Sequence, residues 1–564
     1  MSDTVAARAS YFVYQGHGGP YRDLFNGGHY GEPNQLAGRL QLLWKGEDSK
    51  LKLSAYGFRD KSELTPYKSP GIFTAGGAFC PQILAGTIDK DRTACLRFGS
   101  QVPGADPSGL RETQSIRELN SDVQWLANNS AYGTSARFEH DFGGATLTSI
   151  TSYDYFKRAQ TEDGDNTPYQ TANEYFYSRI KQFSQELRLG GKTGNLNYLV
   201  GGFFEQDSID EVNASVSLNS LAGLPPFAPR LGAEFTQKVR SIAAFTHNEY
   251  EVAPGLSIVA GIRYTNDRNK LDAVTFLGAN DPVGKKQRVT QVIPVDALVD
   301  QRTDENVSFR GGVNWHPADG HLIYGSVSRG FRSGGYSVPF GGAITTFSPE
   351  RLTAYEGGYK GRLLDKTLDL SVSGFYYDYK NLQVNVDDPL SPLVPITRNI
   401  GASRNWGIEG DLAWHPDNSF IVRAGVGYLN AKFTDTDRLV TTYAGAIPLE
   451  GKRPVNTPKL SGQIFVQKSF PVGDDMKIIA QTDGKYTGSR FLEATNQPFD
   501  RAESYWLQNA RLTLEGSGGQ WEVALWGRNI FNKEYLTYIN NIIFFRLEIY
   551  GEPAAYGLST TIRF

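Results

Sequence analysis

Tyr556-Gly-Leu-Ser-Thr-Thr-Ile-Arg-Phe564, at the C-terminal end of the sequence, alternates between two kinds of side chain. Successive side chains of a β-strand point to opposite faces, so residues two apart share a face. One face of such a strand carries Tyr556, Leu558, Thr560, Ile562 and Phe564. The other face carries small or polar residues and Arg563. The stretch therefore predicts a strand with one mainly apolar face and one polar face.

The same division recurs along the chain. Apolar residues hold every second position in segments 256–262, 368–372, 422–428 and 521–525, with mainly polar or small residues between them. This pattern, flanked by turn residues, yields about twenty strands and almost no helical periodicity. A solvated antiparallel sandwich alternates in the same way, so the strands alone leave both architectures open.

The connections between these strands decide between the two architectures, because short and long connections alternate. Nine short turns fall at 46–49, 143–144, 191–194, 253–255, 317–320, 364–366, 416–418, 472–475 and 516–519. Ten long loops fall at 16–34, 60–130, 157–177, 208–234, 269–305, 334–350, 385–397, 434–453, 492–502 and 536–554. Outer-membrane barrels have short periplasmic turns and long extracellular loops. We therefore predict an all-β fold, an antiparallel transmembrane β-barrel with about 20 strands.

The composition agrees with a barrel and argues against several other classes. The 564 residues include 57 Lys plus Arg and 60 Asp plus Glu, a net charge of -3, which does not favour nucleic-acid binding. Aromatic residues reach 12%, which argues against disorder, yet mean hydropathy is only -0.39. Apolar runs such as Ile542–Phe545 are far shorter than the ~18 residues that a membrane helix needs. A membrane location is expected only through strands.

Short motifs follow one another in a fixed order along the whole chain. They are Thr4–Phe12, Ala37–Trp44, Tyr324–Tyr336, Leu352–Lys360, Asn405–Leu412, Asn456–Leu460, Trp526–Tyr535 and the terminal Phe564. In this order they resemble the β-barrel region of TonB-dependent outer-membrane receptors, the energised importers of Gram-negative bacteria. The resemblance implies a barrel of the 22-stranded receptor type, located in the cell outer membrane.

The resemblance also sets an expectation about domain organisation. Family members carry a signal peptide, a TonB-contacting segment and a plug domain ahead of the barrel, and none is recognisable here, because Thr4 onward is already strand-like. The residues Ser2-Asp3-Thr4 resemble the turn before the third barrel strand of the family. We therefore expect residues 1–564 to be one receptor barrel without these parts and without the first two strands.

Three residues stand where a strand passes into a Gly-rich loop and are candidates for substrate binding: Arg329, Arg332 and Tyr336. Guanidinium and phenol groups there would suit an anionic or aromatic ligand such as a ferric chelate. The alternative is that an arginine at the rim pairs with lipopolysaccharide phosphates or with another side chain. The terminal Phe564 resembles the outer-membrane assembly signal that the barrel assembly machinery reads.

Cys80 and Cys95 are fifteen residues apart in the longest predicted loop. An extracellular, oxidising location favours a disulfide, with two free thiols as the alternative. Glu162, Asp163 and Asp165 resemble a calcium loop, but the EF-hand spacing is absent, so a solvated acidic loop tip is favoured. We predict no metal site and no cofactor.

No HExxH, GxSxG or CxxC motif occurs, and we predict that the protein is not an enzyme. The resemblance favours TonB-dependent uptake of a bulky nutrient, most often a ferric siderophore in this family, with vitamin B12, haem, oligosaccharides and other metal chelates as alternatives. The TonB complex would act through a plug. Two other hypotheses remain: a gateless barrel that is a passive pore or a non-functional remnant, and a surface binding or adhesion barrel.

Overall fold

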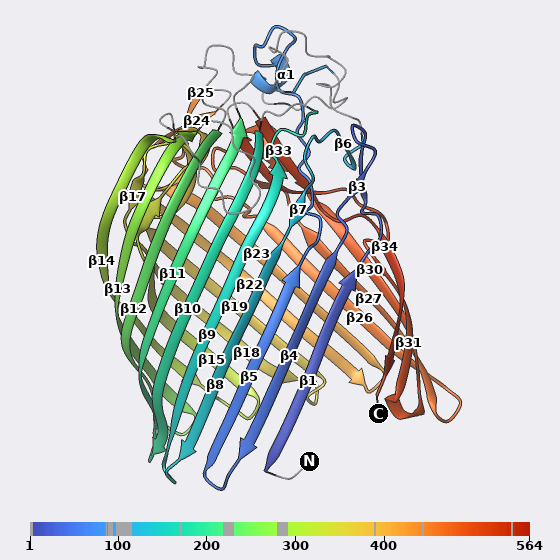
Figure 1. Cartoon of the computed structure of the whole chain (residues 1–564). Coiled ribbons are helices and arrows are strands. Elements are labelled where there is room, and N and C mark those ends of the chain that lie inside the picture. The colour runs from blue at the N-terminus through green and yellow to red at the C-terminus, as the bar shows by residue number, and fades with distance from the viewer. Residues whose placement is uncertain are drawn as a thin grey trace.

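The computed structural model describes residues 4–563 except 86, 88–93, 98–114, 169–171, 218–229, 279–291, 389–390, 437, 443–444 and 543–544. Within them, twenty long strands follow one another in a single antiparallel meander (Figure 1). They are β1 (Val5–Gln15), β4 (Asn34–Lys45), β5 (Ser49–Asp60), β8 (Asn129–Asp141), β9 (Ala145–Asp163), β10 (Ala172–Thr193), β11 (Leu196–Ser217), β12 (Arg230–Ala253), β13 (Leu256–Gly278), β14 (Val292–Trp315), β15 (His321–Arg332), β18 (Glu350–Leu363), β19 (Leu368–Lys380), β22 (Ala402–Asp417), β23 (Phe420–Thr434), β26 (Leu460–Val472), β27 (Met476–Thr487), β30 (Tyr505–Gly516), β31 (Trp521–Arg528) and β34 (Ala555–Ile562). The predicted all-β fold with about 20 antiparallel strands is confirmed.

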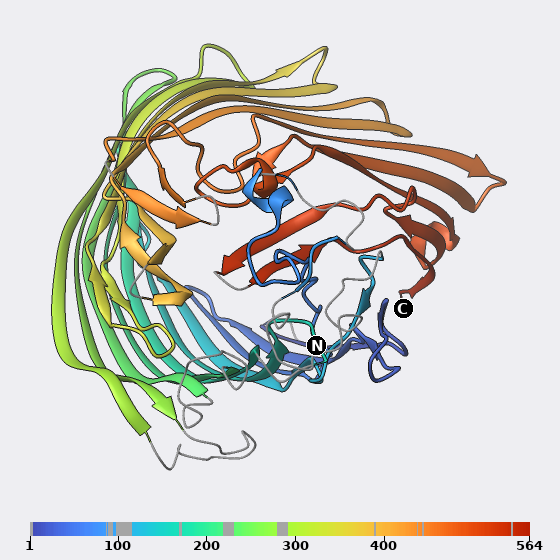
Figure 2. The same cartoon turned by 90° about the horizontal axis from the view of Figure 1, so that it is seen from above.

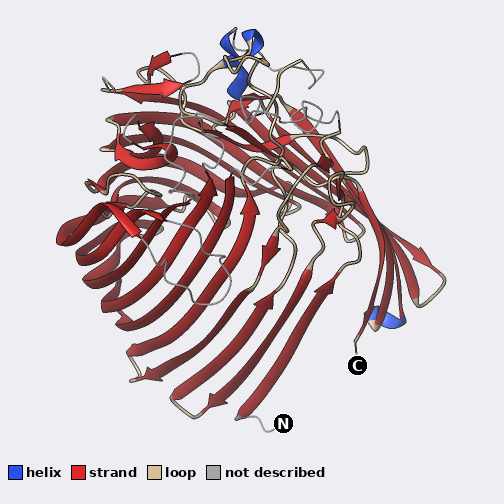
Figure 3. Cartoon of the chain, turned by 45° about the horizontal axis from the view of Figure 1, so that its top comes forward, coloured by secondary structure: helices blue, strands red, loops and turns tan. Residues whose placement is uncertain are grey.

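The alternation of short turns and long loops is also confirmed. Each short turn joins two strands at one end of the barrel, and glycines take a positive φ there, as at Gly143, Gly255 and Gly473. Glycine adopts this conformation without the steric cost that a Cβ imposes. The long loops gather at the other end, where Figure 3 shows short strands and the single-turn helix α1 (Pro81–Leu84).

Some strands are longer than predicted. β13 continues to Gly278 and β14 begins at Val292, whereas the sequence predicted a loop over 269–305. The register runs without a break from Leu256 opposite Trp315 to Thr275 opposite Asp296, so backbone pairing continues where the apolar alternation has ended. A membrane-spanning strand needs only about 9–11 residues. The loop-side halves of these long strands therefore stand beyond the membrane.

The apolar face of the barrel points outward and is exposed. Leu558 and Ile562 of β34 are 64% and 66% exposed, and Val426 of β23 is 57% exposed. Buried apolar clusters lie instead among the loops, as in the group formed by Ile72, Phe73, Cys80, Ile83, Cys95 and Phe499. The molecule therefore has an outer surface suited to lipid and small hydrophobic cores at the loop end.

The first and last strands of the meander, β1 and β34, form its two outer edges. β1 pairs with β4 and β34 pairs with β31, and no pairing between β1 and β34 occurs in the described residues. Figures 1 and 2 show these two edges lying apart. Unpaired backbone groups are costly in a lipid environment, so these edges need partners in the membrane.

Candidate functional site

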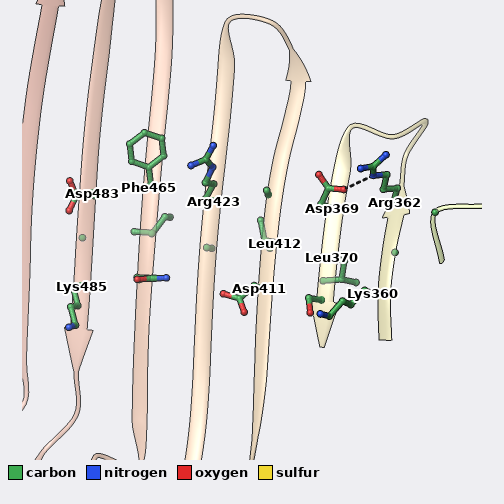
Figure 4. Close-up of a pocket in the computed structure, with 18 of the residues that line it drawn as sticks. Lys360, Arg362, Asp369, Leu370, Asp411, Leu412, Arg423, Phe465, Asp483 and Lys485 are labelled. Carbon is green, nitrogen blue, oxygen red and sulfur yellow. Dashed lines mark ion pairs between the residues drawn. The ribbon is translucent and has the colours of Figure 1, made fainter. Parts of the chain in front are cut away.

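The inner wall of the barrel carries exposed charged side chains of both signs (Figure 4). Near the short-turn end they border a cavity of about 990 Å³. The labelled side chains come from six neighbouring strands, and the charged ones are Lys360, Arg362, Asp369, Asp411, Arg423, Asp483 and Lys485. Strand alternation produces this wall, because every second residue turns inward while its neighbours face lipid.

Local contacts on the wall leave much of its charge accessible to solvent. Arg362 and Asp369 form an ion pair with Nε and Oδ1 3.3 Å apart, and their side chains remain 63% and 50% exposed. The guanidinium of Arg423 lies 5.8 Å from the ring centroid of Phe465. Exposed ion pairs contribute little to stability. The wall is therefore a hydrated polar surface, suited to a polar cargo or to a docked polar domain.

The structure separates the two candidate arginines. Arg329 pairs in register with Phe309, which is 39% exposed on the outer face of β14. Arg332 pairs with Glu350 and shares a face with Tyr324, whose hydroxyl donates to Glu356 on the inner wall. In the described part of the chain, no hydrogen bond or ion pair joins the three candidate side chains to one another.

Tyr336 lies in the small hairpin of β16 (Gly335–Ser337) and β17 (Thr345–Phe347), which lies against the inner side of β14. Its hydroxyl donates to Asp300 Oδ2 at 3.1 Å. Burial, reinforced by this carboxylate, raises the pKa of Tyr336 to about 12. Arg302 donates to the Phe347 carbonyl at 2.7 Å, so the hairpin is held at two points. Tyr336 thus remains a neutral rim residue at ordinary pH.

Arg302 belongs to a polar group at the rim that the sequence did not single out. Its Nη2 lies 2.8 Å from Asp304 Oδ1, and the Gly334 amide donates to Asp304 Oδ2 at 3.0 Å. Both acidic side chains, Asp300 and Asp304, occupy inward positions of β14, and Val299, the residue before Asp300, faces outward with 81% exposure. Residues two apart in a strand share a face, so Asp300, Arg302 and Asp304 lie on the same side of β14. This spacing was the signal in the sequence that could have revealed the polar group.

A second group that the sequence missed joins two loops at the barrel mouth. Figure 2 shows the hairpin of β32 (Leu536–Ile542) and β33 (Phe545–Tyr550) reaching across this mouth. Arg546 of β33 is fully buried, and donates to Asp500 Oδ1 at 3.3 Å and to Glu548 Oε1 at 2.8 Å. Burial raises the pKa of Asp500, although the guanidinium opposes that shift. These loops therefore form a packed cap.

The remaining candidate residues fall in different places. Cys80 and Cys95 form a disulfide in the cap, where both are buried beside Ile83 and Phe499. Phe564 lies outside the described residues, so its role in assembly stays a prediction. No helix in the described ranges is long and apolar enough to cross a membrane.

The acidic segment after β9 differs from its prediction. Asp163 and Asp165 are both 0% exposed, so the interpretation as a solvated loop tip is wrong. Segments that are distant in sequence cover them, including residues 120–125, and this packing left no signal in the local sequence. No group of three or more His, Cys, Asp or Glu residues that could hold a metal ion is found among the described residues.

The apolar outer face, polar lumen and folded loop cap define an outer-membrane β-barrel of the receptor and transporter class. Comparison with known families gives a match to "TonB dependent receptor-like, beta-barrel" over residues 86–530. The chain belongs to this family of Gram-negative outer-membrane receptors.

Curated relatives agree with this family. The chain is 27% identical over 279 residues to "Ferrichrome outer membrane transporter/phage receptor" of Escherichia coli K12, covering 49% of this chain and 34% of that protein. It is 21% identical over 507 residues to "Catecholate siderophore receptor Fiu" of the same strain, covering 81% and 62%. The aligned parts thus span between about a third and three fifths of these two relatives.

Solved structures share the fold. The ferric yersiniabactin uptake receptor FyuA from Yersinia pestis superposes with a TM-score of 0.76 at 13% identity, covering 100% of this chain and 76% of that one. The siderophore receptor PiuA from Acinetobacter baumannii gives 0.71 at 14% identity, covering 99% and 77%. Likeness at such low identity establishes the architecture and no more.

Proposed function

We propose that this chain is the barrel of a TonB-dependent importer for a bulky iron chelate, with a ferric siderophore as the substrate class. The observation that carries the proposal is the exposed charged inner wall beneath a packed loop cap, because a large polar cargo requires a hydrated path and an external binding surface. The names of the two curated relatives, a ferrichrome transporter and a catecholate siderophore receptor, favour this substrate class.

In the working receptor, a plug domain occupies the lumen and two further strands connect β34 to β1. The unpaired edges of β1 and β34 support the two further strands, since pairing with them would satisfy the exposed backbone groups. The mixed charges of the inner wall support a plug domain in the lumen, because a polar domain could dock there through many exchangeable ion pairs. The TonB complex acts on that plug to release bound substrate inward.

The outer surface has its own partners in this proposal. Arg329 lies on the lipid-facing side close to the loop end of β15, where lipopolysaccharide phosphates would meet it, so we assign it to lipid rather than to substrate. Arg332 and Tyr336, on the inner side of the rim, remain the substrate-binding candidates. Phe564 serves the barrel assembly machinery during insertion.

A passive pore is the second candidate, and the hydrated inner wall favours it as well, because exposed charges of both signs would conduct ions. The two functions differ in conductance. A plugged importer reconstituted in a planar bilayer stays closed, whereas a gateless barrel gives large, steady currents.

Ligand binding tests the proposed substrate class directly. The purified chain in detergent is titrated with a ferric catecholate, a ferric hydroxamate and vitamin B12, and tryptophan fluorescence is followed. Saturable quenching by one ferric chelate and none by vitamin B12 is expected. Equal responses to all three, or no response to either chelate, would contradict an iron-siderophore receptor.

A further inference from the structure

Four basic side chains stand together on one face of the hairpin that β12 and β13 form. Lys238 lies directly opposite Lys270 in the strand register, and Arg240 lies directly opposite Arg268. Within each strand the two basic residues are two positions apart, so all four side chains share one face of the sheet. We refer to these four residues as the basic square.

The basic square faces outward, away from the lumen. Ile242 on β12 and Tyr264 on β13 share its face, because each lies an even number of positions from the basic residues of its own strand. Their side chains are 45% and 44% exposed and belong to the apolar outer surface. Figure 1 shows β12 and β13 as neighbouring long strands of the barrel wall.

The square lies at the loop-side boundary of the membrane. β13 begins at a short turn with Leu256, and a spanning strand needs about 9–11 residues. The span therefore ends near Asn266, just before Arg268. In an outer membrane with the long loops outside, this is the level of the lipid headgroups in the outer leaflet.

The strands on either side offer the square no acidic partner. The register places Gln206 and Ser208 of β11 beside its β12 residues, and Gln301 and Thr303 of β14 beside its β13 residues. Among the residues that the structure describes, none of the four basic side chains forms an ion pair, and Arg268 donates to the neutral amide of Gln301. Four positive charges therefore stand together without a bound carboxylate.

This arrangement is unfavourable without an added anion. Directly opposite side chains in an antiparallel pair have Cβ atoms about 4.5–5.5 Å apart, and like charges at such positions destabilise the pair. In addition, Arg240 Nε and Arg268 Nε are buried donors with no hydrogen-bond acceptor. Asp272 follows on the same face, opposite Thr236, and forms no ion pair with the square within the described ranges. An anion over the square would relieve the repulsion and give the guanidinium groups an acceptor.

We propose that the basic square binds the phosphate groups of a lipopolysaccharide molecule in the outer leaflet. Arginine holds phosphate through bidentate hydrogen bonds, and lysine holds it as a point charge. The acyl chains of the same molecule lie along the apolar face beside Ile242 and Tyr264. The square is separate from Arg329 on β15. Lipid binding here is independent of the proposed cargo, because it depends only on the membrane location of the barrel.

A further lysine extends the basic surface along the barrel wall. Lys181 of β10 is directly opposite Ser208, which in turn is directly opposite Lys238. Neighbouring strands are about 4.7–4.9 Å apart, so Lys181 and Lys270, three strand spacings apart, are separated by about 14 Å. A row of this length can hold two phosphate groups of one lipid at the same time.

Lipid binding to the whole chain tests the site. Protein purified in detergent and stripped of lipopolysaccharide is titrated, by thermophoresis, with diphosphorylated lipid A, with lipid A whose phosphates have been removed, and with inorganic phosphate. Saturable binding of the phosphorylated lipid is expected, at least tenfold tighter than binding of the dephosphorylated lipid. Equal binding of the two lipids overturns the proposal. Saturation by inorganic phosphate at the same concentrations also overturns it, because the site would then be one for free anions.

Two double variants locate the lipid phosphates. Arg240→Gln with Arg268→Gln removes one opposed pair, and is expected to weaken binding of phosphorylated lipid A at least tenfold without changing the affinity for the dephosphorylated lipid. The matched control is Lys45→Gln with Lys192→Gln, which removes the same amount of charge at the short-turn end of the barrel. Equal weakening by both double variants, or by neither, overturns the proposal.

Thermal stability separates a lipid site from a structural role of the arginines. Without lipid, removing like charges should leave the unfolding temperature unchanged or higher, as followed by heat-modifiable migration on gels. Added phosphorylated lipid A should raise it more in the wild type than in the variant. A lower unfolding temperature of the lipid-free variant overturns the proposal. If this variant does not fold, Lys238→Gln with Lys270→Gln takes its place, since both lysines are exposed.

Discussion

Arg329 and Arg332 lie on opposite faces of the same strand, β15. Arg329 stands opposite Phe309 on the lipid-facing side, and Arg332 stands opposite Glu350 on the lumenal side. Residues three apart in a strand cannot share a face, so the two guanidinium groups meet different surroundings. This geometry divides a pair of similar residues into one that faces the membrane and one that faces the substrate path.

Substitution of Arg332 is therefore expected to affect ligand binding. Arg332→Ala removes a positive group at the inner rim, and a hydrogen bond to a charged ligand is worth about 1.5–3 kcal/mol, which corresponds to roughly a 10- to 100-fold loss of affinity. Fluorescence titration with the ferric chelate that binds the wild type measures this loss. Arg329→Ala serves as the control and should leave the affinity unchanged; a reversed ranking would refute the assignment.

Substitution of Arg546 should release the loop cap. Arg546→Leu leaves the carboxylates of Asp500 and Glu548 buried without their partner, a change that typically costs about 3–5 kcal/mol. Limited proteolysis should then cut loops 488–504 and 529–554 much faster. The matched control is Arg501→Ala, which breaks an exposed pair with Glu503 and should cost at most about 1 kcal/mol. Similar cleavage of both variants would mean that the buried pair does not hold the cap.

The buried carboxylates of Asp23 and Asp122, in the first two long loops, make the stability of those loops depend on pH. Burial raises the pKa of Asp23 and of Asp122 above 3.8. A raised pKa means that the folded state binds protons more tightly than the unfolded chain, so this contribution is complete below pH 3.8 and is lost as pH rises through the folded pKa.

Protease protection of residues 116–127 should consequently decline as pH rises from about 4 to about 7, as the carboxylates ionise. Protection that increases with pH would show that the carboxylates are stabilised as anions by the protein itself.

Reduction of the disulfide should loosen the cap locally. In the chain-entropy model, a bond between Cys80 and Cys95, with a sequence separation of 15, is worth ~3 kcal/mol. Dithiothreitol or Cys80→Ser should accelerate proteolysis within residues 61–97 and leave the heat-modifiable barrel intact. If reduction changes nothing, packing of Ile83 and Phe499 alone holds the loop.

The barrel could be read from the sequence because lipid and water impose a period of two on every spanning strand, as in β34 and β23. The same period separates Arg329 from Arg332, and applying it to that strand would have divided the candidates at once. The loops carry no such period. Asp163 is buried by residues from around position 121, and Arg546 by residues near position 500, so neither environment follows from local sequence.

Strand ends were the least accurate part of the prediction for a related reason. Beyond the membrane, both faces of β13 and β14 meet water or other loops, so polar residues such as Asp272 and Asp300 occur where the alternation stops. Hydrogen bonding between the backbones does not need an apolar face and continues to the end of the register.

Energised import is the central claim, and substrate uptake tests it most directly. The barrel, together with a receptor plug domain, is expressed in a Gram-negative host that lacks its own ferric-siderophore receptors, and accumulation of a radioactive ferric chelate is measured with and without a functional TonB. We predict saturable uptake only when TonB is functional. Equal accumulation in both hosts would contradict energised import and identify a passive pore.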